Sequence, residues 1–332
     1  MVTLPYDPRM DSGTGFLQNA LSVTPENARC VQELMVAAED PAPNFWEPGV
    51  GEELLVPVEG AELRAFHFPC TGAASCRPVV MVPGFGATPE GFQDFYAAVR
   101  GKAELYYLET REKSSSRISA RRPDMSVSRS ARDVQQALDW LGLSRRGDFL
   151  LIAPCWGATI VLQGLIEGTL DAPTVVVADP MHALWFPKVL LRFVAPVTPT
   201  GLLRALRPLI ARAMLGDMQE PIQKERAYSF AYGADVRKWK AAAHAAWDVE
   251  LIGRLGGIER EVFVLNGTKD KIHDQAFYPR MAAELPRGRF VYMPTEEHNR
   301  ERLFGVAAVD FSRVSANAGL PPGLARFEKT IR

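Results

Sequence analysis

Several features that would mark a special class of protein are missing from this chain of 332 residues. No stretch reaches the roughly 18 uninterrupted apolar residues of a membrane-spanning helix. Residues 1–15 show neither the basic nor the apolar region of a signal peptide. Cysteine is scarce, which fits a reducing compartment better than a disulfide scaffold. We therefore expect a cytoplasmic protein with no stable membrane insertion. Its cysteines are Cys30, Cys70, Cys76 and Cys155.

An excess of charge of either sign is also missing. The 38 lysines and arginines nearly balance the 39 aspartates and glutamates, which leaves a net charge of −1. This balance gives no reason to expect nucleic acid as a partner. Nor is there a convincing metal site, because the neighbours His273 and Asp274 lack a third ligand at a sensible spacing. We predict no metal and no cofactor.

Apolar runs alternate with helical patterns along most of the chain. Residues 1–52 hold one helical pattern, Thr24 to Ala38, and are expected to wrap the surface of the domain. Beyond them, alternation of strands and helices predicts an α/β protein whose mostly parallel sheet is covered by helices on both faces. The expected strands are 54–56, 63–68, 78–82, 104–108, 148–152, 174–178, 261–265 and 289–293, and the expected helices are 89–100, 128–141, 158–166 and 275–285.

The alternation breaks once, between residues 180 and 261. This stretch carries helical patterns and no convincing strand, so we expect a helical cap or lid inserted after the sixth strand. The predicted organisation is a core of residues 53–180 and 261–332 with a lid of residues 181–260. Because such sheets bind ligands at the carboxyl ends of their strands, the lid is expected to cover that edge.

The most informative segment is Ala-Pro-Cys-Trp-Gly at residues 153–157. It follows a strand-like apolar run and precedes a helical one. Small residues two before and two after a nucleophile, in a tight turn between strand and helix, are typical of a nucleophile elbow. Here Ala153 and Gly157 are the small residues, and the nucleophile is Cys155 instead of the usual serine.

From about residue 53 to its C-terminal helix the chain resembles the α/β-hydrolase fold superfamily. That family places a nucleophile after the fifth strand, an acid after the seventh and a histidine after the eighth. Cys155, Asp270 (in Asn266-Gly267-Thr268-Lys269-Asp270) and His298 (in Pro294-Thr295-Glu296-Glu297-His298) match this order. The resemblance implies that Cys155 attacks as a thiolate, that His298 exchanges its proton and that Asp270 orients the imidazole.

The resemblance also implies an oxyanion hole made of two backbone N–H groups. One would belong to Trp156, directly after the nucleophile, and the other to Phe85 in the Pro83–Gly86 turn. The roles of catalytic acid and catalytic base each have other candidates. Asp179 and Asp274 compete with Asp270 for the acid, and His182 and His244 compete with His298 for the base.

A cysteine nucleophile is similar to the choice made by polyhydroxyalkanoate synthases, intracellular depolymerases and dienelactone hydrolases. The synthases usually have glycine where this chain has Ala153, and dienelactone hydrolases are smaller and lack a long lid. We expect a hydrolase that cleaves an ester or thioester with an apolar acyl group through a covalent acyl-thioester. The alternatives are an acyltransferase or polyester synthase- or depolymerase-like enzyme with the same triad, and a catalytically silent, ligand-binding member of the fold.

The predicted lid is rich in apolar and basic residues. From Pro180 to Gly216 it contains no acidic residue, while Lys188 and four arginines are spread along it. Three interpretations are open: a helix with an ordinary buried face, an acyl tunnel whose arginines hold an anionic head group or the phosphates of an acyl-CoA, and transient contact with anionic lipid. The expected partner is a small acyl substrate, such as an acyl-CoA or a polyester. Substrate-lining candidates are His182, Trp185, Phe186 and Arg192.

Overall fold

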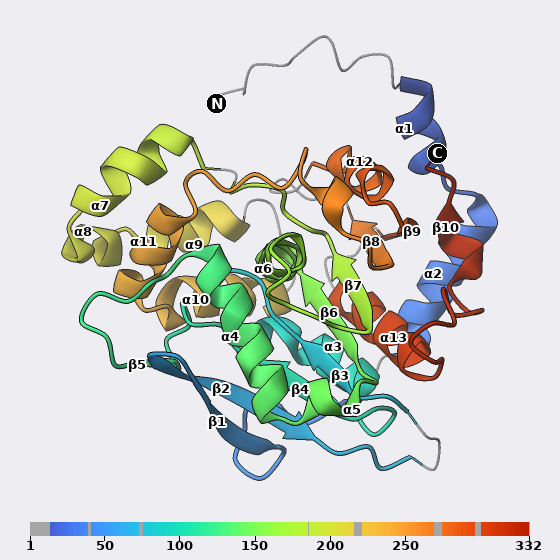
Figure 1. Ribbon diagram of the computed structural model, residues 1–332, viewed down its shortest axis with the longest axis horizontal. Coiled ribbons are helices and arrows are strands. Elements are labelled where there is room, and N and C mark those ends of the chain that lie inside the picture. The colour runs from blue at the N-terminus through green and yellow to red at the C-terminus, as the bar shows by residue number, and fades with distance from the viewer. Residues whose placement is uncertain are drawn as a thin grey trace.

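The computed structural model describes residues 14–38, 41–72, 76–184, 186–215, 221–268, 274–295 and 300–331. Its centre is a single sheet in the order β1-β2-β4-β3-β6-β7-β8-β9-β10, with β5 paired to β2 (Figure 1). The run from β4 to β9 is parallel, and the edge strands are antiparallel. The strands are β1 Glu52–Val58, β2 Ala61–Phe68, β3 Val79–Met81, β4 Leu105–Leu108, β5 Arg117–Ile118, β6 Leu150–Pro154, β7 Thr174–Ala178, β8 Val262–Thr268, β9 Gly288–Thr295 and β10 Glu328–Lys329.

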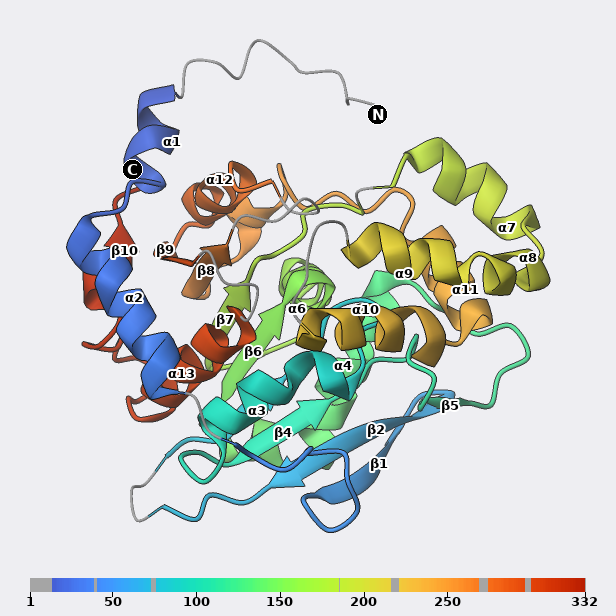
Figure 2. The same cartoon turned by 180° about the vertical axis from the view of Figure 1, so that it is seen from behind.

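Helices cover both faces of this sheet (Figures 1 and 2). One face packs against α4, α6 and α12, and the other against α2, α3 and α13. Successive residues of the central strand β6 serve the two cores in turn, because side chains alternate across a strand: Leu151 and Ala153 lie in the first core, Leu150 and Ile152 in the second. The helices around the sheet are α1 Thr14–Ala20, α2 Pro25–Ala37, α3 Gln93–Val99, α4 Val127–Trp140, α5 Leu143–Arg146, α6 Cys155–Ile166, α12 Phe277–Glu284 and α13 Arg300–Ser312, with 3-10 turns η2 Pro89–Phe92 and η5 Ala325–Phe327.

The predicted fold class is confirmed, and each strand expected from an apolar run is present. The differences are local. The predicted helix 89–100 is divided into η2 and α3, and the helix expected from residue 158 already begins at Cys155. The strands β5 and β10 were not expected, since two residues are too few to form a recognisable pattern.

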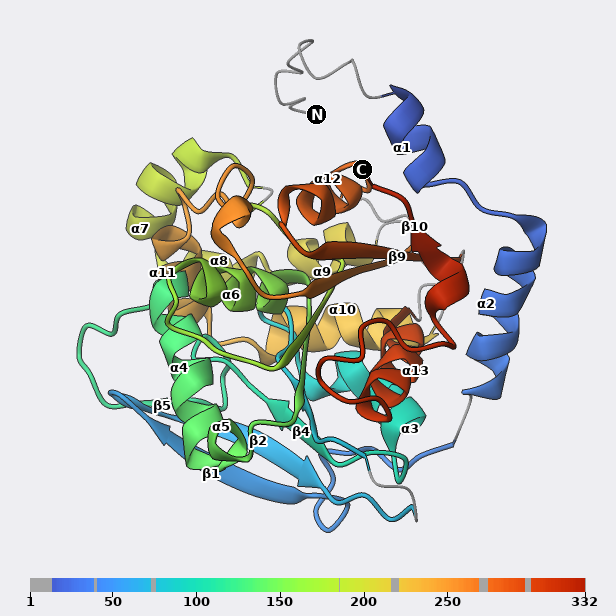
Figure 3. The same cartoon turned by 45° about the vertical axis from the view of Figure 1, so that its right-hand side comes forward.

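The N-terminal helix α2 lies beside the C-terminal elements (Figure 3). The Thr24 hydroxyl caps it by accepting a hydrogen bond from the backbone N–H of Asn27, at 3.2 Å, as Thr24-Pro25 predicts. The Asn27 amide then donates to the Arg326 carbonyl, and Arg302 donates to the Met35 carbonyl, both at 3.2 Å. The first and last described parts of the chain are therefore joined by side-chain contacts.

Between β7 and β8 the described residues form helices and no strand. In Figures 1 and 2 this helical insertion occupies one end of the molecule, and α7 and α8 lie farthest from the sheet. Its elements are the π-helical turn η3 Leu190–Val194, α7 Ala195–Val197, α8 Thr200–Ala205, α9 Arg207–Leu215, α10 Pro221–Gly233, α11 Val236–Ala245 and η4 Leu255–Gly257.

Candidate active site

Cys155 occupies a strained turn at the carboxyl end of the central strand. β6 ends at Pro154 and α6 begins at Cys155, whose φ is +53°. A residue with a Cβ atom rarely adopts this left-handed conformation, because its side chain crowds the backbone. The strain turns the side chain out of the strand-to-helix junction, where it is half-buried. The position thus has the geometry expected of a nucleophile elbow.

The small residues around Cys155 are required by close backbone contacts. A Cβ atom on Gly157 would lie 2.1 Å from the Val82 carbonyl oxygen and 2.8 Å from that of Pro83. A Cβ atom on Gly84 would lie 3.1 Å from the Cβ atom of Cys155 and 3.4 Å from its sulfur. The turn after β3 therefore packs directly against Cys155, and a larger residue at position 84 would require its neighbours to shift by a few tenths of an ångström.

Trp156 and Phe85, whose backbone N–H groups are the expected oxyanion donors, lie on either side of this contact. The N–H of Trp156 is in the first turn of α6, where helical N–H groups lack a partner within the helix. Phe85 belongs to the turn after β3, and its ring meets that of Trp156 edge-on at 6.2 Å between centroids. Trp239 of α11 covers Phe85 from the other side, at 5.7 Å. The two donor-bearing segments are thus neighbours.

Asp270, His298 and His273 lie outside the described residues. The strands that precede them, β8 and β9, run parallel to β6 and end at the same edge of the sheet. The triad of Cys155 with Asp270 and His298 stays a prediction.

The two competing acids have different surroundings. Asp179 follows β7, next to β6; its φ is +44° and it is almost completely buried. The Asn266 amide donates to one of its carboxylate oxygens at 3.1 Å, and the Arg300 guanidinium pairs with the other at 2.9 Å. Asp274 is exposed and accepts a hydrogen bond from the backbone N–H of Ala276, at 2.9 Å, just before α12.

The competing histidines have partners in the insertion or beside it. His182 pairs through Nδ1 with the Glu250 carboxylate, and its ring lies 4.1 Å from that of Phe277. His244 of α11 contacts the carbonyl of Leu191 through Nδ1 at 3.0 Å. Cys155 also has a contact that the sequence did not single out: the Sδ atom of Met181 is 3.4 Å from the Cys155 sulfur.

The other substrate-lining candidates, Trp185, Phe186 and Arg192, belong to the first part of the insertion. Phe186 is exposed, and Trp185 lies outside the described residues. Arg192 is also exposed, with its guanidinium 4.4 Å above the ring of Trp247 and 5.0 Å from that of Phe193. A role for these residues in substrate binding stays a prediction.

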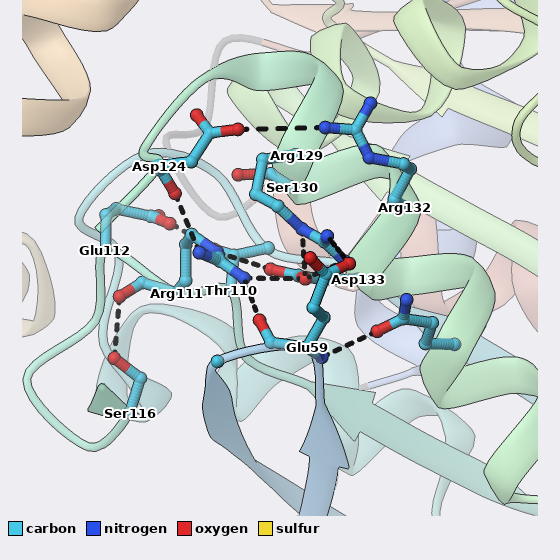
Figure 4. A network of polar contacts seen from close by, with 12 residues as sticks. Glu59, Thr110, Arg111, Glu112, Ser116, Asp124, Arg129, Ser130, Arg132 and Asp133 are labelled. Atoms are coloured by element: carbon cyan, nitrogen blue, oxygen red, sulfur yellow. Dashed lines mark hydrogen bonds and ion pairs between the residues drawn. The ribbon is translucent and has the colours of Figure 1, made fainter. Parts of the chain in front are cut away.

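A buried charged network holds the loop after β4 (Figure 4). Arg111 donates to both carboxylate oxygens of Asp133 in α4, one at 2.7 Å, and to the Asp124 carbonyl at 2.7 Å. Arg129 binds the same carboxylate and that of Glu59, between β1 and β2. Burial raises the pKa of Asp133 above its ordinary value although both guanidinium groups lower it. The network joins the loop, α4 and the β1-β2 hairpin.

This loop reaches the turn beside Cys155 through Lys113. Lys113 is 4% exposed, pairs with the Glu112 carboxylate at 2.9 Å and donates to the carbonyl of Gly84. Lys238 of α11 donates to the Lys113 carbonyl at 2.8 Å, and burial lowers the pKa of its ammonium group. No local pattern reveals this role, because Gly84 and Lys238 are distant from Lys113 along the chain.

A cleft of about 510 Å³ opens between this loop, η2 and α10. Its wall begins at Gly86, next to Phe85, so it adjoins the turn that packs on Cys155. Aromatic and charged side chains share the lining, which includes Arg64, Glu90, Glu109, Glu112, Lys113, Tyr228, Tyr232 and Trp239.

Neither a metal site nor a membrane-spanning helix is present among the described residues. No three histidine, cysteine, aspartate or glutamate side chains come together there in a way that could hold a metal ion. None of the helices found in those same ranges is long and apolar enough to cross a membrane.

The model of the alpha/beta hydrolase family matches residues 79–304, so the chain belongs to that family. Solved structures with the same fold include a thermophilic esterase from Thermogutta terrifontis, at 17% identity and a TM-score of 0.62, over 78% of this chain and 95% of that one. The enol-lactonase from Burkholderia xenovorans has the same identity and TM-score, over 78% and 99%. An esterase from Exiguobacterium antarcticum is 16% identical, with a TM-score of 0.61, over 80% and 100%.

Proposed function

We propose that this member of the alpha/beta hydrolase family hydrolyses an ester or thioester with an apolar acyl group, and that Cys155 is its nucleophile. The observation that carries the proposal is the strained conformation of Cys155, with φ of +53°, at the carboxyl end of the central strand. Such strain is retained where the surrounding structure over-determines it, and it is concentrated at functional sites. The similar esterases and the lactonase support the choice of acyl chemistry.

In the proposed reaction the Cys155 thiolate attacks the carbonyl carbon of the substrate. The N–H groups of Trp156 and Phe85 stabilise the oxyanion, and the leaving group departs with a proton from His298. The acyl group is then a thioester on Cys155. His298 takes a proton from water, whose oxygen attacks the thioester and releases the carboxylic acid and the thiolate. Asp270 holds the imidazole in the required tautomer.

We further propose that residues 181–260 act as a lid over this site. Supporting the proposal, Met181 contacts the Cys155 sulfur at the start of the insertion, and Trp239 packs on Phe85 from within it. Both contacts bring the insertion close to Cys155 and to the turn after β3 that packs on it.

The decisive test compares Cys155→Ala with Cys30→Ala on a panel of p-nitrophenyl esters and acyl-CoAs. Cys30 is the matched control, because it is also a half-buried thiol but lies in α2, outside the proposed site. We expect Cys155→Ala to lower kcat/KM at least about 10³-fold, as loss of a nucleophile does, and Cys30→Ala to leave it unchanged. Intact-mass spectrometry should detect an acyl adduct on the wild type and not on Cys155→Ala.

Other outcomes would lead to different conclusions. Full activity of Cys155→Ala would exclude Cys155 as the nucleophile. A wild type with neither turnover nor adduct across the panel would favour the silent, ligand-binding member of the fold. Transfer of the acyl group to an added alcohol, amine or thiol in preference to water would favour the acyltransferase.

The catalytic acid is assigned by comparing Asp270→Asn with Asp179→Asn, and we expect the larger loss of kcat for Asp270→Asn.

A further inference from the structure

The helical insertion exposes an unusual amount of apolar surface. Of the thirteen large apolar side chains that are exposed in the described residues, eight lie between residues 186 and 209. Val197 is 76% exposed, Val189 is 66% and Phe193 is 59%. Apolar patches that are contiguous and exposed mark interaction sites. We call these eight residues the apolar face: Phe186, Val189, Leu190, Phe193, Val194, Val197, Leu202 and Leu209.

The spacing of these residues places most of them on one side of a helix. Residues 188–197 are continuously helical through η3 and α7. Val189, Phe193 and Val197 recur every four residues and form one stripe, with Leu190 and Val194 forming its neighbour. Leu191 is instead buried, and its carbonyl contacts His244 of α11 at 3.0 Å. The side of the segment that carries Leu191 thus packs against the protein, and the side that carries the apolar stripe is exposed to solvent.

The charges carried by the chain segment that forms the apolar face are all positive. Residues 180–216 contain no acidic residue. Arg192, Arg204 and Arg212 are exposed on this stretch, whereas Arg207 donates to the Ala234 carbonyl at 2.8 Å. Lys188 lies 3.6 Å from Glu250, so its charge is partly balanced from outside the stretch. An apolar stripe with arginines beside it is complementary to anionic head groups above acyl chains.

We propose that the apolar face docks the protein reversibly on an anionic lipid surface, with the helical segment 188–197 lying in the plane of the interface. The segment is far too short to span a bilayer, but its length suits a helix that inserts one side about 5–10 Å deep. Pairing with a second copy of the chain is less favourable, because it would bring two sets of arginines together. The proposal does not depend on the nucleophile, and Cys155→Ala should bind lipid as the wild type does.

Cosedimentation with vesicles tests the docking. We expect the wild type to bind vesicles of phosphatidylcholine and phosphatidylserine and to bind pure phosphatidylcholine at least about tenfold more weakly. Val197→Asp should lower binding to the mixed vesicles at least about tenfold, because it places a carboxylate in the inserted stripe. Val36→Asp in α2 is the matched control, since Val36 is 60% exposed and α2 lies away from α7 and α8 (Figure 2), and this variant should bind normally.

A second pair of variants tests the charge. Arg204→Gln should weaken binding about fivefold, the effect of one cation near an anionic surface, and Arg121→Gln in the loop after β5 should have no effect. Absence of wild-type binding, or equal losses for Val197→Asp and Val36→Asp, would overturn the proposal. If light scattering shows that the wild type is a dimer and that Val197→Asp is a monomer, and the wild type does not bind vesicles, the apolar face would be assigned to self-association instead.

Discussion

The three central valines of β7, Val175, Val176 and Val177, are completely buried, whereas Val189, Val194 and Val197 of the insertion are 45–76% exposed. In the strand, side chains alternate between the two faces of the sheet, so Val175 and Val177 lie in one core and Val176 in the other, whereas the three valines of the insertion lie on neighbouring stripes along one side of a helix. The difference is in what covers them. β7 lies between two parallel strands with helices on both faces, and no described element packs on the outer side of the insertion. Periodicity therefore decides which side chains share a face but not whether that face is inside.

The largest difference in unfolding free energy between the core and the insertion is expected when one phenylalanine of each is replaced by alanine. Phe263 in β8 is 1% exposed and packs on Phe311 at 4.7 Å between centroids, whereas Phe193 lies in the apolar face. Phe263→Ala should lower the free energy of unfolding by about 3–5 kcal/mol, because it leaves a cavity in the core. Phe193→Ala should change it by less than about 0.5 kcal/mol. Urea unfolding of the two variants measures both values, and equal losses would mean that the insertion is as closely packed as the sheet.

A buried and an exposed ion pair should also differ in how much they contribute to the free energy of unfolding. Asp133→Asn removes the carboxylate that binds Arg111 and Arg129, which are both buried, and should cost about 3 kcal/mol of unfolding free energy. Lys188→Met breaks an exposed pair with Glu250 and should cost less than about 1 kcal/mol. The same urea experiment checks this order. A small effect of Asp133→Asn would show that the network in Figure 4 contributes little to holding the loop.

The smallest difference is expected when two helical glycines are each replaced by alanine. We expect the free energy of unfolding to fall at one position and to rise at the other. Gly157→Ala in α6 would place a Cβ atom 2.1 Å from the Val82 carbonyl oxygen and should lower the unfolding free energy by about 1–3 kcal/mol. Gly201→Ala in α8 meets no atom within 4 Å and should raise it by about 0.5–1 kcal/mol, since alanine favours the helix. Thermal unfolding distinguishes the two. A stable Gly157→Ala would contradict the close packing of the elbow.

The parts of the fold that the sequence predicted are those controlled by local patterns. Apolar runs located the strands, and Thr24-Pro25 located the start of α2, because capping depends on neighbours three residues away. The elbow was recognised for the same reason: Ala153, Cys155 and Gly157 lie within five residues. The strained φ of Cys155 and the clash at Gly157 are the physical causes of that short pattern.

The parts that were not predicted depend on contacts between distant residues. Arg111 and Arg129 lie in an arginine-rich stretch whose local pattern shows no sign of burial, yet both are buried against Asp133. Lys113 reaches Gly84 from another strand end, which no local spacing reveals. Asp270 and His298 are predicted from their order along the chain, and their positions remain outside the described residues.

The contacts between the two ends of the chain have a consequence for the time course of folding. The helix α2 leaves the ribosome before its partners, which include Arg302 and Arg326. The parallel neighbours β7 and β8 must likewise wait for the whole insertion to be synthesised before they can pair. Because domains form as units during synthesis, α2 cannot complete its docking until translation has passed β9, α13 and finally residue 326. Until then, Val31 and Met35, which are buried in the finished protein, are exposed to chaperones and proteases.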